Sequence, residues 1–219
     1  MTAPEERRRA FGLHVLADDA PHWKLDPVEQ ARAACGGGAQ VVQLRAKHAT
    51  DRVALAWARE IRRHTQACGA LFFVNDRFDL ALAADADGVH LGQNDLPPAR
   101  VPASARHRLL IGRSTHALDQ VQAAREEPVD YVAFGPVFGT RSKTSEVSAR
   151  GPAMLARVVR AAAPRAVIAI GGIDADNLDA VLETGAAGIA VISAVAGADD
   201  PVAIVRRLAA PWHQRGDAR

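Results

Sequence analysis

Short apolar runs recur along the chain and alternate with longer stretches rich in Ala, Arg and Leu. Runs with the Val, Ile, Leu and Phe content of buried strands lie at residues 12–17, 41–45, 71–74, 88–91, 109–112, 131–134, 166–170 and 188–192. The stretches between them predict helices at 26–35, 51–67, 117–125, 151–162, 174–183 and 200–208, with only short helices at 77–84 and 97–101.

Eight strands that alternate with helices predict an α/β fold with a parallel sheet, because a tight hairpin cannot join parallel neighbours. Eight such units close into a (β/α)₈ TIM barrel. The alternative, an open doubly wound sheet, usually has a glycine fingerprint after its first strand, whereas this chain has Asp18-Asp19-Ala20-Pro21. We therefore expect a single barrel over 12–210, an N-terminal extension over 1–11 and a polar C-terminal tail over 211–219.

Polar residues follow most of the predicted strands, at the end of the barrel where active sites form. They include Gln43, Arg45, Lys47, Asn75, Asp76, Asp95, Ser114 and Thr115. Asp76 and Ser114 are also suitable helix caps, so each alone is ambiguous. Gln43, Arg45 and Lys47 alternate, which predicts a ladder on one face at the barrel mouth. Because buried cations without partners are costly, this ladder implies an anionic ligand.

Two further features predict the charge of that ligand. Gly171-Gly172 and Ile192-Ser193 end the last two predicted strands, where barrels often bind phosphate through backbone N–H groups, although such glycines also suit a simple tight turn. Asp76 and Asp95 would repel each other at one mouth unless a cation lay between them, and Mg²⁺ suits carboxylates together with phosphate oxygens. Arg45, Lys47 and Lys143 against the two aspartates and Mg²⁺ leave a net charge at the mouth that suits a diphosphate of roughly −3 near neutral pH. The second phosphate pocket then predicts two phosphorylated ligands, or one ligand phosphorylated at both ends.

The overall charge argues against large anionic partners. Lys and Arg number 27 against 25 Asp and Glu, which gives a net charge of +2, and we expect neither nucleic acid nor a membrane as partner. Cys35 and Cys68 lack the spacing of a zinc site, and the histidines are scattered. With no secretory signal or membrane-spanning run in the sequence, we expect a cytoplasmic enzyme, and the sequence leaves a homo-oligomer open.

Taken together, the motifs resemble those of the thiamine phosphate synthase family. They are Gln43-Leu44-Arg45-Ala46-Lys47, Val74-Asn75-Asp76, His90-Leu91-Gly92-Gln93-Asn94-Asp95, Gly112-Arg113-Ser114-Thr115-His116, Gly135-Pro136-Val137-Phe138, Lys143, Ile170-Gly171-Gly172-Ile173 and Ile192-Ser193. The resemblance implies a Mg²⁺-dependent transferase of thiamine biosynthesis. Its small-molecule substrates would be 4-amino-2-methyl-5-(diphosphooxymethyl)pyrimidine and a thiazole phosphate or its carboxylated form, and its products thiamine phosphate and diphosphate.

The resemblance also implies roles for individual residues. The pyrimidine diphosphate would be held by Gln43, Leu44, Arg45, Ala46, Lys47, Asn75, Ser114 and Lys143, and Mg²⁺ by Asp76 and Asp95. The thiazole phosphate would lie against Thr140, Arg141, Ser142, Gly172, Ile192 and Ser193. Arg45, Lys47, Lys143 and Ser114 would be the catalytic groups, stabilising charge on the departing diphosphate in a dissociative reaction.

The chain departs from the family pattern at a few positions. It has Thr140-Arg141-Ser142-Lys143 where Thr-x-Thr-Lys is usual, Gly139 where proline is common, and His14 where an aromatic residue is common. A related thiazole tautomerase is an alternative, but its relatives place a histidine where this chain has Pro136. A barrel that binds phosphate ligands without catalysis is another, although it would need neither the cations nor both aspartates.

Overall fold

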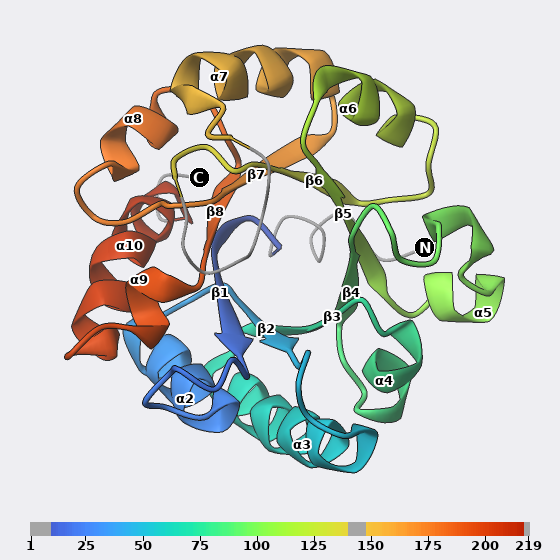
Figure 1. Cartoon of the computed structure of the whole chain (residues 1–219), viewed down its shortest axis with the longest axis vertical. Helices are drawn as coiled ribbons and strands as arrows, with labels where there is room; N and C mark the ends of the chain where they lie inside the picture. The colour runs from blue at the N-terminus through green and yellow to red at the C-terminus, as the bar shows by residue number, and fades with distance from the viewer. Residues whose placement is uncertain (1–9, 140–147, 217–219) are drawn as a thin grey trace.

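The structure, a computed structural model, describes residues 10–139 and 148–216, the last three by their backbone alone. Its strands form one closed parallel barrel in the order in which they occur in the sequence, β1 to β8, with β8 paired to β1. Viewed along the barrel, the helices surround the ring of strands (Figure 1). The expected (β/α)₈ barrel is therefore confirmed.

The strands lie close to their predicted positions. They are β1 (Gly12–Asp18), β2 (Val41–Arg45), β3 (Leu71–Asn75), β4 (Gly88–Leu91), β5 (Leu110–Thr115), β6 (Tyr131–Phe134), β7 (Ala166–Ile170) and β8 (Gly188–Val191). The main difference is β5, which continues beyond the predicted 109–112 because Ser114 and Thr115 still pair with β6. The predicted strand ended too early because the polar side chains of Ser114 and Thr115 resemble those of a loop, although their backbone remains in the sheet.

The connecting helices vary widely in length. They are α2 (Pro27–Gly37), α3 (Asp51–Cys68), α4 (Phe78–Ala83), the 3₁₀ helix η1 (Pro98–Arg100), α5 (Ala103–Arg106), α6 (Leu118–Ala124), α7 (Gly151–Ala162), α8 (Leu178–Leu182), α9 (Ser193–Ala196) and α10 (Pro201–Gly216). The start of α2 is fixed by a capping box, in which Asp26 accepts from the backbone of Val28 and Glu29.

Four helices differ from the sequence prediction: the short helices α5 and α9 were not predicted, and α8 and α10 have different bounds. The first part of the predicted 174–183 helix is a turn, because the Asp174 carboxylate accepts from the backbone N–H groups of Asp176 and Asn177. At the C-terminus, α10 continues to Gly216, and Trp212 packs against the core. His213 adds a hydrogen bond to the Gly38 carbonyl (3.0 Å). Residues 211–216, expected to lie in the tail, therefore belong to the last helix.

The core has two layers, which follow from the alternation of side chains along each strand. Outward-facing residues such as Leu13, Val42 and Phe72 pack against the helices. Inward-facing residues such as Leu16, Phe73 and Tyr131 fill the barrel. The inward positions become polar toward the carboxyl ends of the strands, and this change of composition places the candidate site.

Candidate active site

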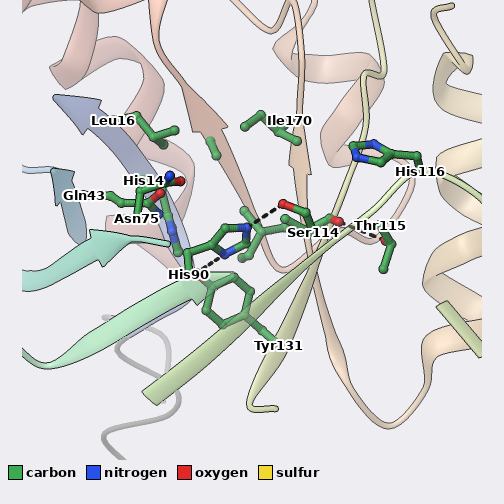
Figure 2. A pocket seen from close by; sticks show the side chains of 13 residues that line it. His14, Leu16, Gln43, Asn75, His90, Ser114, Thr115, His116, Tyr131 and Ile170 are labelled. Atoms are coloured by element: carbon green, nitrogen blue, oxygen red, sulfur yellow. Dashed lines mark hydrogen bonds between the residues drawn. The ribbon is translucent and has the colours of Figure 1, made fainter. Parts of the chain in front are cut away.

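A cavity of about 40 Å³ lies inside the barrel and reaches the carboxyl ends of the strands. Polar side chains that line it include His14, Gln43, Asn75, His90, Ser114 and His116, and Figure 2 shows them converging from different strands. Three of the predicted ligand-binding residues, Gln43, Asn75 and Ser114, are thus brought together. The strand register explains this. Asn75 on β3 pairs with His90 on β4, His90 pairs with Gly112 on β5, and Ser114 lies two residues beyond Gly112.

Gln43 carries an unused hydrogen-bond acceptor. Gln43 is only 2% exposed, and its buried Oε1 atom has no hydrogen-bond partner among residues 10–139 and 148–216. An unpartnered buried acceptor is costly, so its presence at a cavity wall indicates a ligand with an N–H or O–H donor. An amino group on a heteroaromatic ring provides such a donor.

Arg45 is held by a carboxylate that the sequence analysis did not consider. Its Nη1 donates to Asp18 Oδ1 at 2.5 Å, and Trp23 Nε1 donates to Asp18 Oδ2 at 2.7 Å. Asp18 is fully buried and lies directly beside Arg45 in the register of β1 and β2. Asp18 is the last residue of β1, as Arg45 is the last residue of β2. This place at a strand end is the sequence signal that could have identified Asp18 as a site residue.

Lys47 also has a partner, since its ammonium forms an ion pair with Asp76. Asp76 in turn is hydrogen-bonded to Asp95, whose Oδ2 accepts from the Gly92 N–H at 2.6 Å. The prediction of an unpartnered cation ladder is therefore wrong: Asp18 and Asp76 neutralise Arg45 and Lys47.

The two aspartates titrate as a pair. Burial raises the pKa of Asp76, the neighbouring Asp95 carboxyl raises it further, and Lys47 opposes the rise. For Asp95, burial acts in the same upward direction, but hydrogen bonds from Asp76 and the Gly92 backbone leave its pKa below the ordinary value. The two carboxyls are therefore coupled, and Asp76 is the one whose pKa is raised.

These aspartates have the chemistry of a site for a hard cation. The two carboxyls interact with each other, and a divalent ion bound by both would balance their negative charge. Within residues 10–139 and 148–216, no group of three or more His, Cys, Asp or Glu side chains is placed to hold a metal. Two carboxylates with the remaining positions filled by water or substrate match the usual binding of Mg²⁺.

Asp19 fixes the loop that carries Lys47. Its carboxylate accepts from the backbone N–H groups of Lys47, His48 and Ala49, each at 2.8 Å. Although partial burial acts against ionisation, these three bonds lower the pKa of Asp19. The loops after β1 and β2 are therefore tied together at the mouth.

The predicted phosphate region lies at the ends of β7 and β8. Gly171 and Gly172 have φ angles of 101° and 63°, and a Cβ atom on Gly172 would lie 2.3 Å from the Gly139 carbonyl oxygen. The loop after β6 approaches them closely, since Phe138 N–H donates to the Gly171 carbonyl at 2.9 Å. Ser193 follows Ile192 and begins α9, so both glycines and the start of α9 lie at adjacent strand ends.

Some predicted residues contribute differently or lie elsewhere. The Leu44 side chain is buried on the helix side of the barrel, and Ala46 packs against the same cluster, so only their main chains are available to a ligand. Thr140, Arg141, Ser142 and Lys143 lie outside the described residues.

Comparison with known proteins identifies the family. The sequence profile described as "Thiamine monophosphate synthase" matches residues 13–195. The chain belongs to the thiamine monophosphate synthase family. This match includes all of the strands except the first residue of β1, and all of the helices from α2 to α8.

Two relatives and one solved structure match this chain over nearly their whole length. A thiamine-phosphate synthase of Anaeromyxobacter dehalogenans is 47% identical over 214 residues, which cover 97% of this chain and 93% of the relative. Its counterpart in Methanoculleus marisnigri is 43% identical, with 90% and 93% covered. The solved structure of thiamine phosphate pyrophosphorylase from Pyrococcus furiosus matches with a TM-score of 0.84 at 38% identity, over 94% of this chain and 98% of that chain.

Among the described residues, none of the helices combines the length and the apolar character needed to cross a bilayer. The family's fold thus accounts for the apolar residues, which pack in the two core layers.

Proposed function

We propose that this protein is a thiamine phosphate synthase, a transferase of thiamine biosynthesis. It joins 4-amino-2-methyl-5-(diphosphooxymethyl)pyrimidine to a thiazole phosphate and releases diphosphate. Family membership supports the reaction class. The observation that carries the assignment at this site is the unpartnered Gln43 acceptor, which lines the same cavity as Asn75 and Ser114. It suits the amino group of the pyrimidine.

In the proposed reaction, the bond between the pyrimidine methylene carbon and the diphosphate oxygen breaks, and a bond from that carbon to the thiazole nitrogen forms. The electron pair of the broken bond leaves with the diphosphate, so negative charge grows on that group. Arg45 and Lys47 supply positive charge near the mouth, and Ser114 supplies a hydroxyl. Such donors are effective because they are already oriented before the reaction.

Asp18 and Asp19 prepare this arrangement. Asp18 holds the Arg45 guanidinium, and Asp19 holds the backbone at Lys47. We propose that Asp76 and Asp95 hold Mg²⁺, which when bound would neutralise charge on the diphosphate. Lys47 would then exchange its Asp76 partner for a phosphate oxygen. By resemblance, the thiazole phosphate would bind at Gly172, Ile192 and Ser193, and Thr140 to Lys143 would complete the site.

Diphosphate release tests this proposal directly. The protein is incubated with both substrates and Mg²⁺, and inorganic diphosphate is measured with and without the thiazole phosphate. We expect release that requires all three components. Ser114→Ala should lower the rate by about 10², whereas Ser104→Ala, which removes an exposed hydroxyl on α5, should leave it unchanged.

The same experiment separates the alternatives named above. A thiazole tautomerase would convert its substrate without releasing diphosphate, and a non-catalytic barrel would bind the thiazole phosphate with no turnover. Either result would overturn the synthase assignment. A cytoplasmic location stays a prediction of the sequence.

A further inference from the structure

A chain of hydrogen bonds lies beneath Ser114 on the cavity wall. His90 Nε2 is 2.9 Å from Ser114 Oγ, and His90 Nδ1 is 3.0 Å from the Tyr131 hydroxyl. Figure 2 shows the imidazole between the two hydroxyl groups. His90 is 8% exposed and Tyr131 only 1%. The proposed function uses Ser114 but gives no task to His90 or Tyr131.

The barrel is shaped to permit this contact. Gly112 on β5 pairs with His90 on β4 and with Tyr131 on β6, so it lies between them. A Cβ atom at Gly112 would lie 2.4 Å from both His90 Nδ1 and the Tyr131 hydroxyl oxygen. Because no side chain fits there, the glycine leaves room for the imidazole and the phenol to meet. The two rings are stacked, with centroids 5.6 Å apart.

Tyr131 stays protonated in this environment. Burial raises the pKa of Tyr131, and the neighbouring Asp130 raises it further. Its hydroxyl is therefore available as a donor. A phenol is a stronger acid than an aliphatic alcohol and so is the better donor to an imidazole nitrogen.

The direction of the chain decides what Ser114 offers to a ligand. If Tyr131 donates to His90 Nδ1, the imidazole proton is on Nε2 and is donated to Ser114 Oγ. The Ser114 hydrogen is then directed away from His90 and is available to a ligand. In the opposite direction, Ser114 would donate to His90 and offer only lone pairs, which repel an anion.

We propose that Tyr131 and His90 are positioning residues that fix Ser114 as a hydrogen-bond donor toward the diphosphate of the substrate. This inference rests on the proposed function, which supplies the anionic ligand. It assigns the imidazole a structural proton on Nε2 and no proton transfer in the reaction. Neither residue needs to touch the substrate.

The test compares Tyr131→Phe, Ser114→Ala and the double variant. Tyr131→Phe keeps the ring and removes only the hydroxyl. Isothermal titration with inorganic diphosphate in the presence of Mg²⁺ should show binding weakened roughly tenfold to a hundredfold in Ser114→Ala, as expected for a hydrogen bond to a charged group. Tyr131→Phe should weaken binding roughly threefold to tenfold. In the Ser114→Ala background, Tyr131→Phe should cause no further loss.

A second measurement determines which nitrogen of the His90 imidazole carries the proton. Side-chain ¹⁵N NMR of His90 in the wild-type protein should show the proton on Nε2 and an unprotonated Nδ1, and Tyr131→Phe should shift this tautomer balance. Thr65→Val serves as the matched control, because it removes another buried hydroxyl, on α3, which donates to the Arg62 carbonyl. It should alter neither diphosphate affinity nor the His90 signals.

The outcomes separate the inference from the function on which it rests. If the wild-type protein binds diphosphate and turns over, but Tyr131→Phe binds equally well, the inference is overturned and the function stands. A wild-type His90 protonated on Nδ1, or equal losses for Tyr131→Phe in both backgrounds, also overturns it. A wild-type protein that neither binds diphosphate nor releases it overturns both.

Discussion

The Asp18 carboxylate should contribute strongly to stability, and Asp18→Asn tests this with minimal change of shape. Asp18 accepts from two donors, Arg45 Nη1 at 2.5 Å and Trp23 Nε1 at 2.7 Å. An asparagine has one acceptor oxygen, and its NH₂ group would face the second donor. The substitution therefore leaves one donor unsatisfied and removes the charge that balances Arg45.

The expected cost follows from the burial of the pair. Removing one partner of a buried ion pair costs about 3 to 5 kcal/mol. The Asp18 side chain is 0% exposed but Arg45 is 15% exposed, so water reaches the guanidinium and the lower end applies. We expect Asp18→Asn to lower the free energy of unfolding by about 3 kcal/mol. In a Trp23→Phe background, Asp18→Asn should lower the free energy of unfolding by only about 1 to 2 kcal/mol, because the asparagine oxygen then accepts from Arg45 and no second donor is left without a partner.

Equilibrium unfolding in urea, followed by far-UV circular dichroism, measures these differences, provided that the slopes with denaturant agree between variants. Asp51→Asn is the matched control, since Asp51 is paired with Arg77 but is 80% exposed. It should change stability by less than about 0.5 kcal/mol. An Asp18→Asn variant as stable as Asp51→Asn, or an equal cost in both Trp23 backgrounds, would refute the reasoning.

Three further predictions concern activity and pH. Lys143→Ala should fold normally and lose about 10² to 10³ in kcat, measured by diphosphate release; an unchanged rate would remove Lys143 from the proposed site. Asp95→Asn should raise the Mg²⁺ concentration needed for half-maximal rate without unfolding the protein, and an unaltered Mg²⁺ dependence in a titration would contradict the metal assignment. Burial lowers the pKa of His14 from 6.5 to about 4, against the hydrogen bond to the Ala10 carbonyl. Between these two pKa values the unfolded chain binds more protons than the folded one. The free energy of unfolding is therefore unaffected by His14 above pH 6.5 and falls by about 3 kcal/mol as the pH is lowered toward 4. Replacing His14 with Phe should flatten this part of the urea-midpoint profile, unlike His107→Gln at an exposed position, and a profile that keeps its slope would show that another group is responsible.

Several parts of the site could be read from the sequence because they are local in the chain. Gln43 lies within a predicted strand, and Asn75 and Ser114 lie just after predicted strands. The barrel brings the carboxyl ends of its strands together whatever loops connect them. The Gly171-Gly172 pair also stands out in the sequence. The structure adds the reason for glycine there, since both φ angles are positive and the Gly139 carbonyl leaves no room for a Cβ atom on Gly172.

Other parts depend on contacts between residues far apart in the chain. Asp18 and Arg45 are separated by 27 positions, and His90 and Tyr131 by 41. Each pair also requires a third residue, Trp23 in the first and Gly112 in the second. The alternation of Gln43, Arg45 and Lys47 along the sequence records which charges are present but not which carboxylates neutralise them, and for this reason the prediction treated Arg45 and Lys47 as cations without partners.

The sequence by itself determined the barrel, the strand positions and the family, because these depend on the periodic pattern of apolar residues and on motifs at strand ends. Only the tertiary structure decided which groups pair at the mouth, where α10 ends, and that His90 stands between Ser114 and Tyr131. The physical reason is that strand formation and burial follow from the local pattern, whereas ion pairs and hydrogen bonds act over a few ångströms between strands whose register is fixed only when the barrel closes.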